Sequence, residues 1–278
     1  MHASTVRSLL VRGMLAGLIA GLFAFVVAYA VGEPPVNGSI AVEEANAAKE
    51  APAEPAAHGA HAGHAGGAAA AEPAAEEEEI SRSTQSTFGL ATGVLVYGVA
   101  LGGIASLAFS FVLGRVGRFS PRATAALTAA AAFTTVYLVP FLKYPATPPA
   151  VGNPDTIGKR TTLFFLMILL SVLLGIGAVI AGRRLAPRLG NWNATLAAGA
   201  GFVAVTAIAF AVLPDNTDAV AAGFPAALLW EFRVASLAIQ VVLWGVFGIV
   251  FGVLAQKALA ARTAASDPED RLAAPAAG

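Results

Sequence analysis

Six apolar stretches, each long enough to cross a membrane, constrain this chain more than any other feature of its sequence. A helix needs about 20 apolar residues to cross the hydrocarbon core of a bilayer, which is about 30 Å thick. The stretches are 9–31, 88–113, 123–142, 161–181, 194–213 and 234–255. Their only charged residue is Arg12, near the start of the first, and its long side chain can reach the interface. The sequence therefore predicts an all-α membrane protein with six transmembrane helices.

Composition excludes several classes of function. Charged residues make up 12% of the 278 residues and hydrophobic residues 57%, whereas a soluble protein is about 25% charged. The net charge is zero, so a basic surface for nucleic acid is missing. The chain has no cysteine, no P-loop pattern and no histidine in the apolar stretches, which removes the residues for thiolate sites, ATP hydrolysis and intramembrane zinc or haem chemistry. We expect no enzyme and no permanently bound cofactor.

The basic residues divide unequally between the two sides of the predicted bundle. The side holding both termini and the segments 114–122 and 182–193 has eleven lysines and arginines, and the opposite side has six. Cytoplasmic loops carry the excess of Lys and Arg, so both termini are expected in the cytoplasm. Fourteen of the seventeen acidic residues fall on the outer side, leaving −8 outside and +8 inside. An acidic outer surface concentrates cations.

The first apolar stretch has two interpretations. Arg7 and Arg12 before an apolar run that ends Ala28-Tyr29-Ala30 are compatible with a cleaved signal peptide. The stripe of Gly13, Gly17 and Gly21 favours a retained helix that a neighbour approaches closely. With retention, the expected organisation is a first transmembrane helix at 1–31, a disordered external loop at 32–87, a five-helix remainder at 88–256 and a mobile cytoplasmic tail at 257–278.

The long external loop contains three of the four histidines. His58, His61 and His64 are separated by glycine and alanine, and four consecutive glutamates follow at 76–79. Imidazole binds divalent transition metals such as Co²⁺ and Zn²⁺, and flexible spacers allow three rings to reach one ion. The segment fits either metal capture or an ordinary solvated linker.

Charged residues recur where the apolar stretches meet the outer side. The acids there are Glu33, Asp215, Asp218 and Glu231, and the arginines Arg82, Arg160 and Arg233 each begin a predicted helix. A cation at a helix N-terminus opposes the helix dipole, so pairing with Glu33, Asp215 or Glu231 is one interpretation and simple interfacial anchoring is the other. The proline-rich segment 141–152, with Lys143 and Tyr144, is expected to be a stiff external loop after Pro140.

The borders of the stretches also repeat. Leu138-Val139-Pro140 is followed 20 residues later by Arg160, and Val212-Leu213-Pro214 is followed 19 residues later by Arg233. Glu33-Pro34 and Arg82 offer a related pair in the first part of the chain. Three tandem helical hairpins explain this recurrence, and chance recurrence at membrane borders is the alternative.

Several motifs resemble the CbtA family of probable cobalt transporter subunits. The similarity covers about residues 5–260 and is carried by Val31-Gly-Glu-Pro34, Ser39-Ile-Ala-Val-Glu43-Glu44, Ile80-Ser-Arg82, Val139-Pro-Phe-Leu-Lys-Tyr-Pro-Ala-Thr-Pro-Pro-Ala-Val-Gly152, Leu213-Pro-Asp215 and Leu229-Trp-Glu-Phe-Arg233. The resemblance implies an inner-membrane protein that supplies cobalt for cobalamin synthesis, with a small His-bearing partner of the CbtB type. It adds Glu43 and Glu44 to the candidate metal ligands, which are His58, His61, His64, Glu33, Asp215 and Glu231.

Two functions from different classes remain open. In the first, the chain is a permease or a component of one for Co²⁺ or another divalent transition metal, which is the transported ion. Because no charged or histidine ligand lies at mid-membrane, its pathway has to use Thr134, Thr135, Thr206, Gln240, backbone carbonyls or a partner's ligands. In the second, the chain is an accessory scaffold in the lipid bilayer that hands metal to another protein.

Overall fold

The computed structural model describes residues 3–50, 81–149, 151–152, 154–216, 220 and 223–266. Within these ranges the chain is helical and has no strand. Among the described residues five helical stretches are long and apolar enough to cross a membrane: Ala3–Lys49, Arg82–Val112, Pro121–Lys143, Ile157–Val212 and Ala226–Ala261. The prediction of an all-α fold with the character of a membrane protein is confirmed at this level.

The first helix is far longer than predicted. Helix α1 (Ala3–Val27) continues through a π-helical turn, η1 (Ala28–Gly32), into α2 (Glu33–Glu50). In η1 the N–H of Glu33 donates to the carbonyl of Ala28, five residues back. A wider turn of this kind accommodates Pro34 and Pro35, which have no N–H to give. The expectation of disorder from residue 32 onward is therefore wrong for 33–50, and the rest of that loop up to residue 80 lies outside the described residues.

Glycines bring the next helix into close contact with α1. Residues 82–112 form α3 (Arg82–Thr84), a π-turn η2 (Gln85–Gly89) and α4 (Leu90–Val112), so the predicted loop already ends before residue 87. A Cβ added to Gly17 would overlap the carbonyl of Gly98, and one added to Gly102 would overlap the carbonyl of Gly13. The glycine stripe of α1 thus packs directly on α4, as small residues do between membrane helices.

A proline reshapes the third stretch near its C-terminal end. Helix α5 (Pro121–Ala132) passes through the π-turn η3 (Phe133–Leu138) into α6 (Val139–Lys143), where Pro140 stands in the first turn. Phe141–Lys143 is therefore helical and not part of an extended loop, because Pro140 has the backbone φ of a helix start. The extended segment begins at Tyr144.

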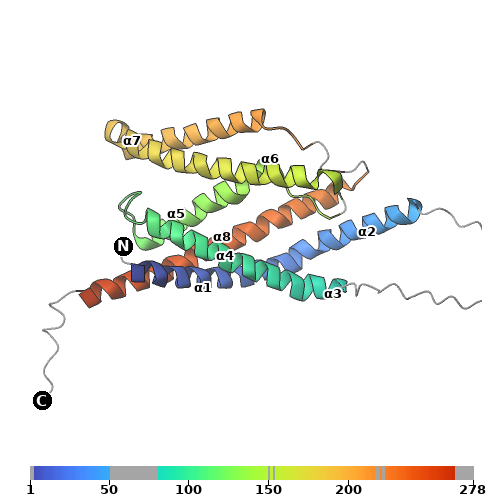
Figure 1. Cartoon of the computed structure of the whole chain (residues 1–278), viewed down its shortest axis with the longest axis horizontal. Coiled ribbons are helices and arrows are strands. Elements are labelled where there is room, and N and C mark those ends of the chain that lie inside the picture. The colour runs from blue at the N-terminus through green and yellow to red at the C-terminus, as the bar shows by residue number, and fades with distance from the viewer. Residues whose placement is uncertain are drawn as a thin grey trace, which may run out of the picture.

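Helix α7 (Ile157–Val212) reverses direction at Gly190, whose φ of 76° and ψ of 160° are not helical. Figure 1 shows its two arms side by side, in yellow and orange. Gly182 of the first arm meets the second arm, because a Cβ there would lie 3.3 Å from the Cβ of Ala198. The two arms contain the predicted stretches 161–181 and 194–213.

Two apolar cores hold the bundle together. The larger one joins α1, α4, α5 and α8 (Ala226–Ser266) around Phe109, Trp244, Phe247 and Phe251. The smaller one joins α6 to both arms of α7 through Val139, Tyr144 and Met167. Helix α8 packs mainly on α1 and α5, and α7 is not among its main partners. The predicted arrangement in three tandem hairpins is therefore not confirmed.

Charged residues gather at the two ends of the described structure. The start of α1, the end of α8 and the turn of α7 lie at one end, and α2, α3, the end of α6 and the start of α8 lie at the other (Figure 1). We call the second one the acidic end, after Glu33, Glu43, Glu44 and Glu231 in its helices and Asp215, which pairs with Lys143 there. Basic residues, among them Arg82 and Arg233, lie at the same end. The two groups of loops inferred from the sequence thus lie at opposite ends.

Candidate cation site at the acidic end

The first charged contact joins α3 to α2. Arg82 forms an ion pair with Glu33 through its Nη2 and donates from Nε to Oδ1 of Asn37 at 3.1 Å. The side chain of Glu33 is only 13% exposed, so the carboxylate needs this partner. Asn37 was not singled out from the sequence, although its place one turn after Glu33 puts both side chains on one face of a helix. Arg82 is thus compensated by Glu33, one of the three candidate acids.

A second charged contact joins α6 to the end of α7. The ammonium Nζ of Lys143 donates to the backbone carbonyl of Phe210 at 2.7 Å and pairs with Oδ1 of Asp215. Proline explains why that carbonyl is available: the residue four positions after Phe210 is Pro214, which has no N–H to donate. The lysine side chain is 8% exposed, whereas that of Asp215 is 82% exposed. Asp215 therefore forms its ion pair with Lys143 and not with one of the three arginines.

Tyr144 also connects the end of α6 to the segment that follows α7. Its hydroxyl donates to the carbonyl of Pro214 at 2.8 Å, and the Nζ of Lys143 lies 5.8 Å from the centre of its ring. Burial raises the pKa of the Tyr144 hydroxyl, and the positive charge of Lys143 offsets part of that rise. The hydroxyl thus keeps its proton at neutral pH and remains a donor.

The other two arginines hold the segment 144–152. Arg233 donates from Nε to the carbonyl of Ala146 at 3.4 Å. The guanidinium of Arg160 fills the space beside Gly152, where a Cβ would overlap it. Arg233 does not begin a helix as expected, because α8 already starts at Ala226. Both side chains fasten this loop to the acidic end.

The remaining candidate metal ligands do not come together in one site within the described residues. Glu231, Glu43 and Glu44 are exposed, and none of them forms an ion pair with a described basic residue. The pairing expected for Glu231 with Arg160 or Arg233 is thus not formed. No group of three His, Asp or Glu side chains that could hold a metal is found within the described ranges. His58, His61, His64 and Asp218 lie outside them.

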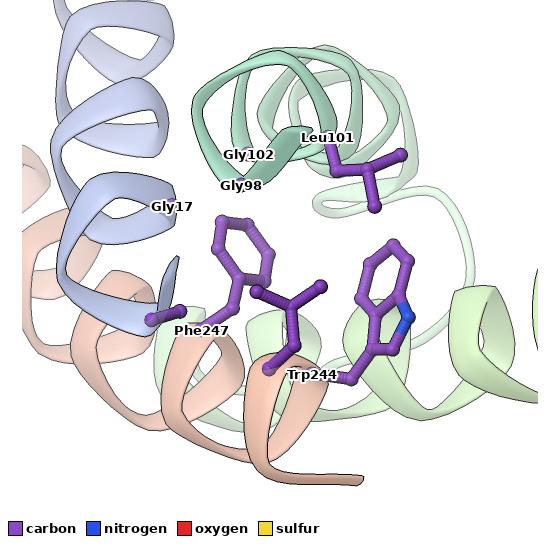
Figure 2. A pocket seen from close by; sticks show the side chains of 8 residues that line it. Gly17, Gly98, Leu101, Gly102, Trp244 and Phe247 are labelled. Carbon is purple, nitrogen blue, oxygen red and sulfur yellow. The ribbon is translucent and has the colours of Figure 1, made fainter. Parts of the chain in front are cut away.

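The interior of the bundle offers neutral polar groups. The hydroxyl of Ser171 in α7 donates to the carbonyl of Thr135 in η3, which lacks its usual partner since Val139 donates to Thr134 and Pro140 has no N–H. The amide of Gln240 is a hydrogen-bond partner of Tyr97. Among the described residues Tyr137, Thr206, Gln240 and Trp244 each keep one buried polar atom without a partner. A small cleft beside Gly17 and Gly98 is lined by apolar groups, with the ring of Phe247 between the helices (Figure 2).

These features define the class of the protein: a multi-pass helical membrane protein whose charges are confined to its two ends. The family model for the probable cobalt transporter subunit, CbtA, matches residues 6–256, and the chain belongs to that family. It is therefore assigned to cobalt transport across a membrane, in a family of transporter subunits and not of enzymes. Membership of such a family implies a further component of the transport system. Neither curated proteins nor solved structures gave a match.

Proposed function

We propose that this chain is the membrane-embedded subunit of an uptake system for cobalt that serves cobalamin synthesis. The observation that carries the proposal is the family match over residues 6–256, together with the five apolar helical stretches found among the described residues. The sequence adds a second argument, because the segments predicted on the outer side carry a net charge of −8 and therefore attract cations.

The proposed topology has six crossings of the inner membrane with both termini in the cytoplasm. The reversal of α7 at Gly190 supports six crossings, since each of its arms is long enough to span the hydrocarbon core. The excess of arginine at the end that holds the start of α1 and the end of α8 supports the orientation. In this topology the acidic end faces outward.

The ion is captured outside by His58, His61 and His64 with nearby acids, and a small CbtB-like partner completes the system. Imidazoles on a segment rich in glycine and alanine favour Co²⁺ over Mg²⁺. The bundle itself offers only neutral groups, such as Gln240 and the threonines, between its two charged ends. A dehydrated divalent ion is costly there, so ligands from the partner are expected along the pathway.

Uptake of Co²⁺ into proteoliposomes tests this function and separates it from that of a scaffold. The purified chain is reconstituted alone and together with its partner, and internal cobalt is measured by elemental analysis. Cobalt accumulation above protein-free vesicles, with or without the partner, supports a role in transport. Binding of cobalt without accumulation in either preparation contradicts transport and supports the accessory role.

A further inference from the structure

We propose that the position of the Lys143 ammonium is a cation-binding site at the outer mouth, which a hydrated divalent cation occupies when Lys143 is displaced. The inference rests on the proposed uptake function for the direction in which the ion travels. Binding itself is independent of transport and can be measured without it.

The groups around the ammonium are those that bind cations. The carbonyl oxygen of Phe210, the carboxylate of Asp215 and the ring of Tyr144 surround one positive charge. Phe210 also lies in the last turn of α7, which ends at Val212, where the helix dipole favours cations. Pro214 keeps the carbonyl free of a helical partner and also accepts the hydrogen bond that holds Tyr144. The ammonium of Lys143 thus occupies a position that the surrounding groups make suitable for a cation.

Exposure determines how an ion reaches this site. Asp215 is 82% exposed while Lys143 is 8% exposed, so an arriving ion meets the carboxylate first and the lysine lies behind it. The lysine is a single charge on a flexible four-carbon stem, which allows the ammonium to withdraw without backbone movement. The two cations then compete for the same carboxylate and carbonyl.

The ligand set also determines selectivity. One carboxylate and one carbonyl are hard oxygen ligands, and with only two of them a divalent ion keeps most of its water. No described residue adds an imidazole here, since the three loop histidines lie outside the described ranges. We therefore expect Mg²⁺ and Co²⁺ to bind this site with similar strength.

Thermal unfolding of the purified full-length chain in detergent tests the site. The proteins compared are the wild type, Lys143→Met and the double variant Lys143→Met with Asp215→Asn, each titrated with MgCl₂ against NaCl of equal ionic strength. Lys143→Met is expected to unfold at a lower temperature and to regain a few degrees as Mg²⁺ saturates the site. The double variant should show no such gain. A folded Lys143→Met protein without a saturable shift, or an equal shift in the double variant, overturns the proposal.

Competition between Mg²⁺ and the Lys143 ammonium is measured in the wild-type protein, so the result does not depend on the folding of a variant. A water-soluble amine-acylating reagent is applied with and without Mg²⁺, and labelling is read by mass spectrometry. Labelling of Lys143 should rise severalfold with Mg²⁺, while the exposed Lys159 provides the control. Unchanged labelling of Lys143 at saturating Mg²⁺ overturns the displacement. Because neither measurement involves transport, failure of cobalt uptake is a separate result.

Discussion

At the scale of single residues, prolines and glycines decide how this bundle is joined. Pro140 and Pro214 each leave a carbonyl without its helical donor, and a side chain from another segment occupies it: Ser171 for Thr135 and Lys143 for Phe210. Glycines in α1 and α4 remove the side chains that would separate the two helices. Small changes of side chain at these positions are therefore expected to change the stability of the fold measurably.

Gly17→Ala tests the contact between α1 and α4. A methyl group there overlaps the carbonyl of Gly98, and overpacking of this kind costs about 1–3 kcal/mol. We expect a lower unfolding midpoint in detergent. Gly93→Ala is the matched control, because nothing lies near its added Cβ, and it should leave the midpoint unchanged or raise it. Equal midpoints for both variants contradict the packing argument.

Ser171→Ala tests the carbonyl freed by Pro140. Removal of the hydroxyl leaves the carbonyl of Thr135 without a donor and should cost about 1–3 kcal/mol. Ser110→Ala is the control: this serine is also buried, but its hydroxyl donates only to the carbonyl of Ser106 in its own helix. Thermal unfolding of the two variants should differ by a few degrees. No difference would show that another donor replaces Ser171.

At the scale of elements, sequence patterns locate the apolar helices well and their polar extensions poorly. Hydropathy identifies α4, α8 and both arms of α7, because a run of about 20 apolar residues is typical of a helix that crosses a membrane. Residues 33–50 lack apolar periodicity and contain Pro34 and Pro35, so they resemble a loop. They are helical in the structure since α1 precedes them, and extending an existing helix avoids the cost of nucleation. Context of this kind is not contained in the local sequence.

The same limit applies to the candidate site. Repetition at the borders indicated Arg82, Arg160 and Arg233, and the proline-rich segment indicated Lys143 and Tyr144. The structure places each of them in contact with another segment. Their partners were less predictable. Asp215 pairs with Lys143, and two arginines meet backbone or glycine, because loop geometry and not charge order along the chain decides which groups meet.

In the proposed topology, the segment that carries His58, His61 and His64 is expected to bind ions before transport and not to form part of the pathway. Replacement of His58, His61 and His64 by alanine should reduce cobalt uptake mainly at low metal concentration, since capture matters little once metal is abundant. Initial uptake rates over a range of Co²⁺ concentrations measure this effect, with His2→Ala as the control. Complete loss of uptake at saturating cobalt would place the histidines in the pathway itself.

At the scale of the whole molecule, η3 connects two packed units. Phe133 at its start packs on the larger core, and Val139, directly after it, belongs to the smaller core with both arms of α7. The segment 121–143 is thus shared between the two units, and its π-helical turn lies where the change occurs. π-turns are frequent at functional sites.

The crossing by the first arm of α7 can be tested directly because the chain has no cysteine. Single cysteines at Trp192, near the turn of α7, and at Lys159, before its first apolar arm, are exposed positions. In right-side-out membrane vesicles a membrane-impermeant thiol reagent should label Lys159→Cys, and Trp192→Cys only after permeabilisation. Labelling of both from the same side without permeabilisation contradicts the proposed topology.

The length of α2 has an electrostatic consequence for how ions approach the molecule. Glu43 and Glu44 lie ten and eleven residues beyond Glu33 in the same helix, which separates them from it by about 15 Å. At physiological ionic strength the Debye length is about 8 Å. The carboxylates far along α2 and those at the membrane border therefore act on ions as two separate electrostatic regions. At low ionic strength the two regions merge into a single attractive field, and the association rate of cations should rise accordingly.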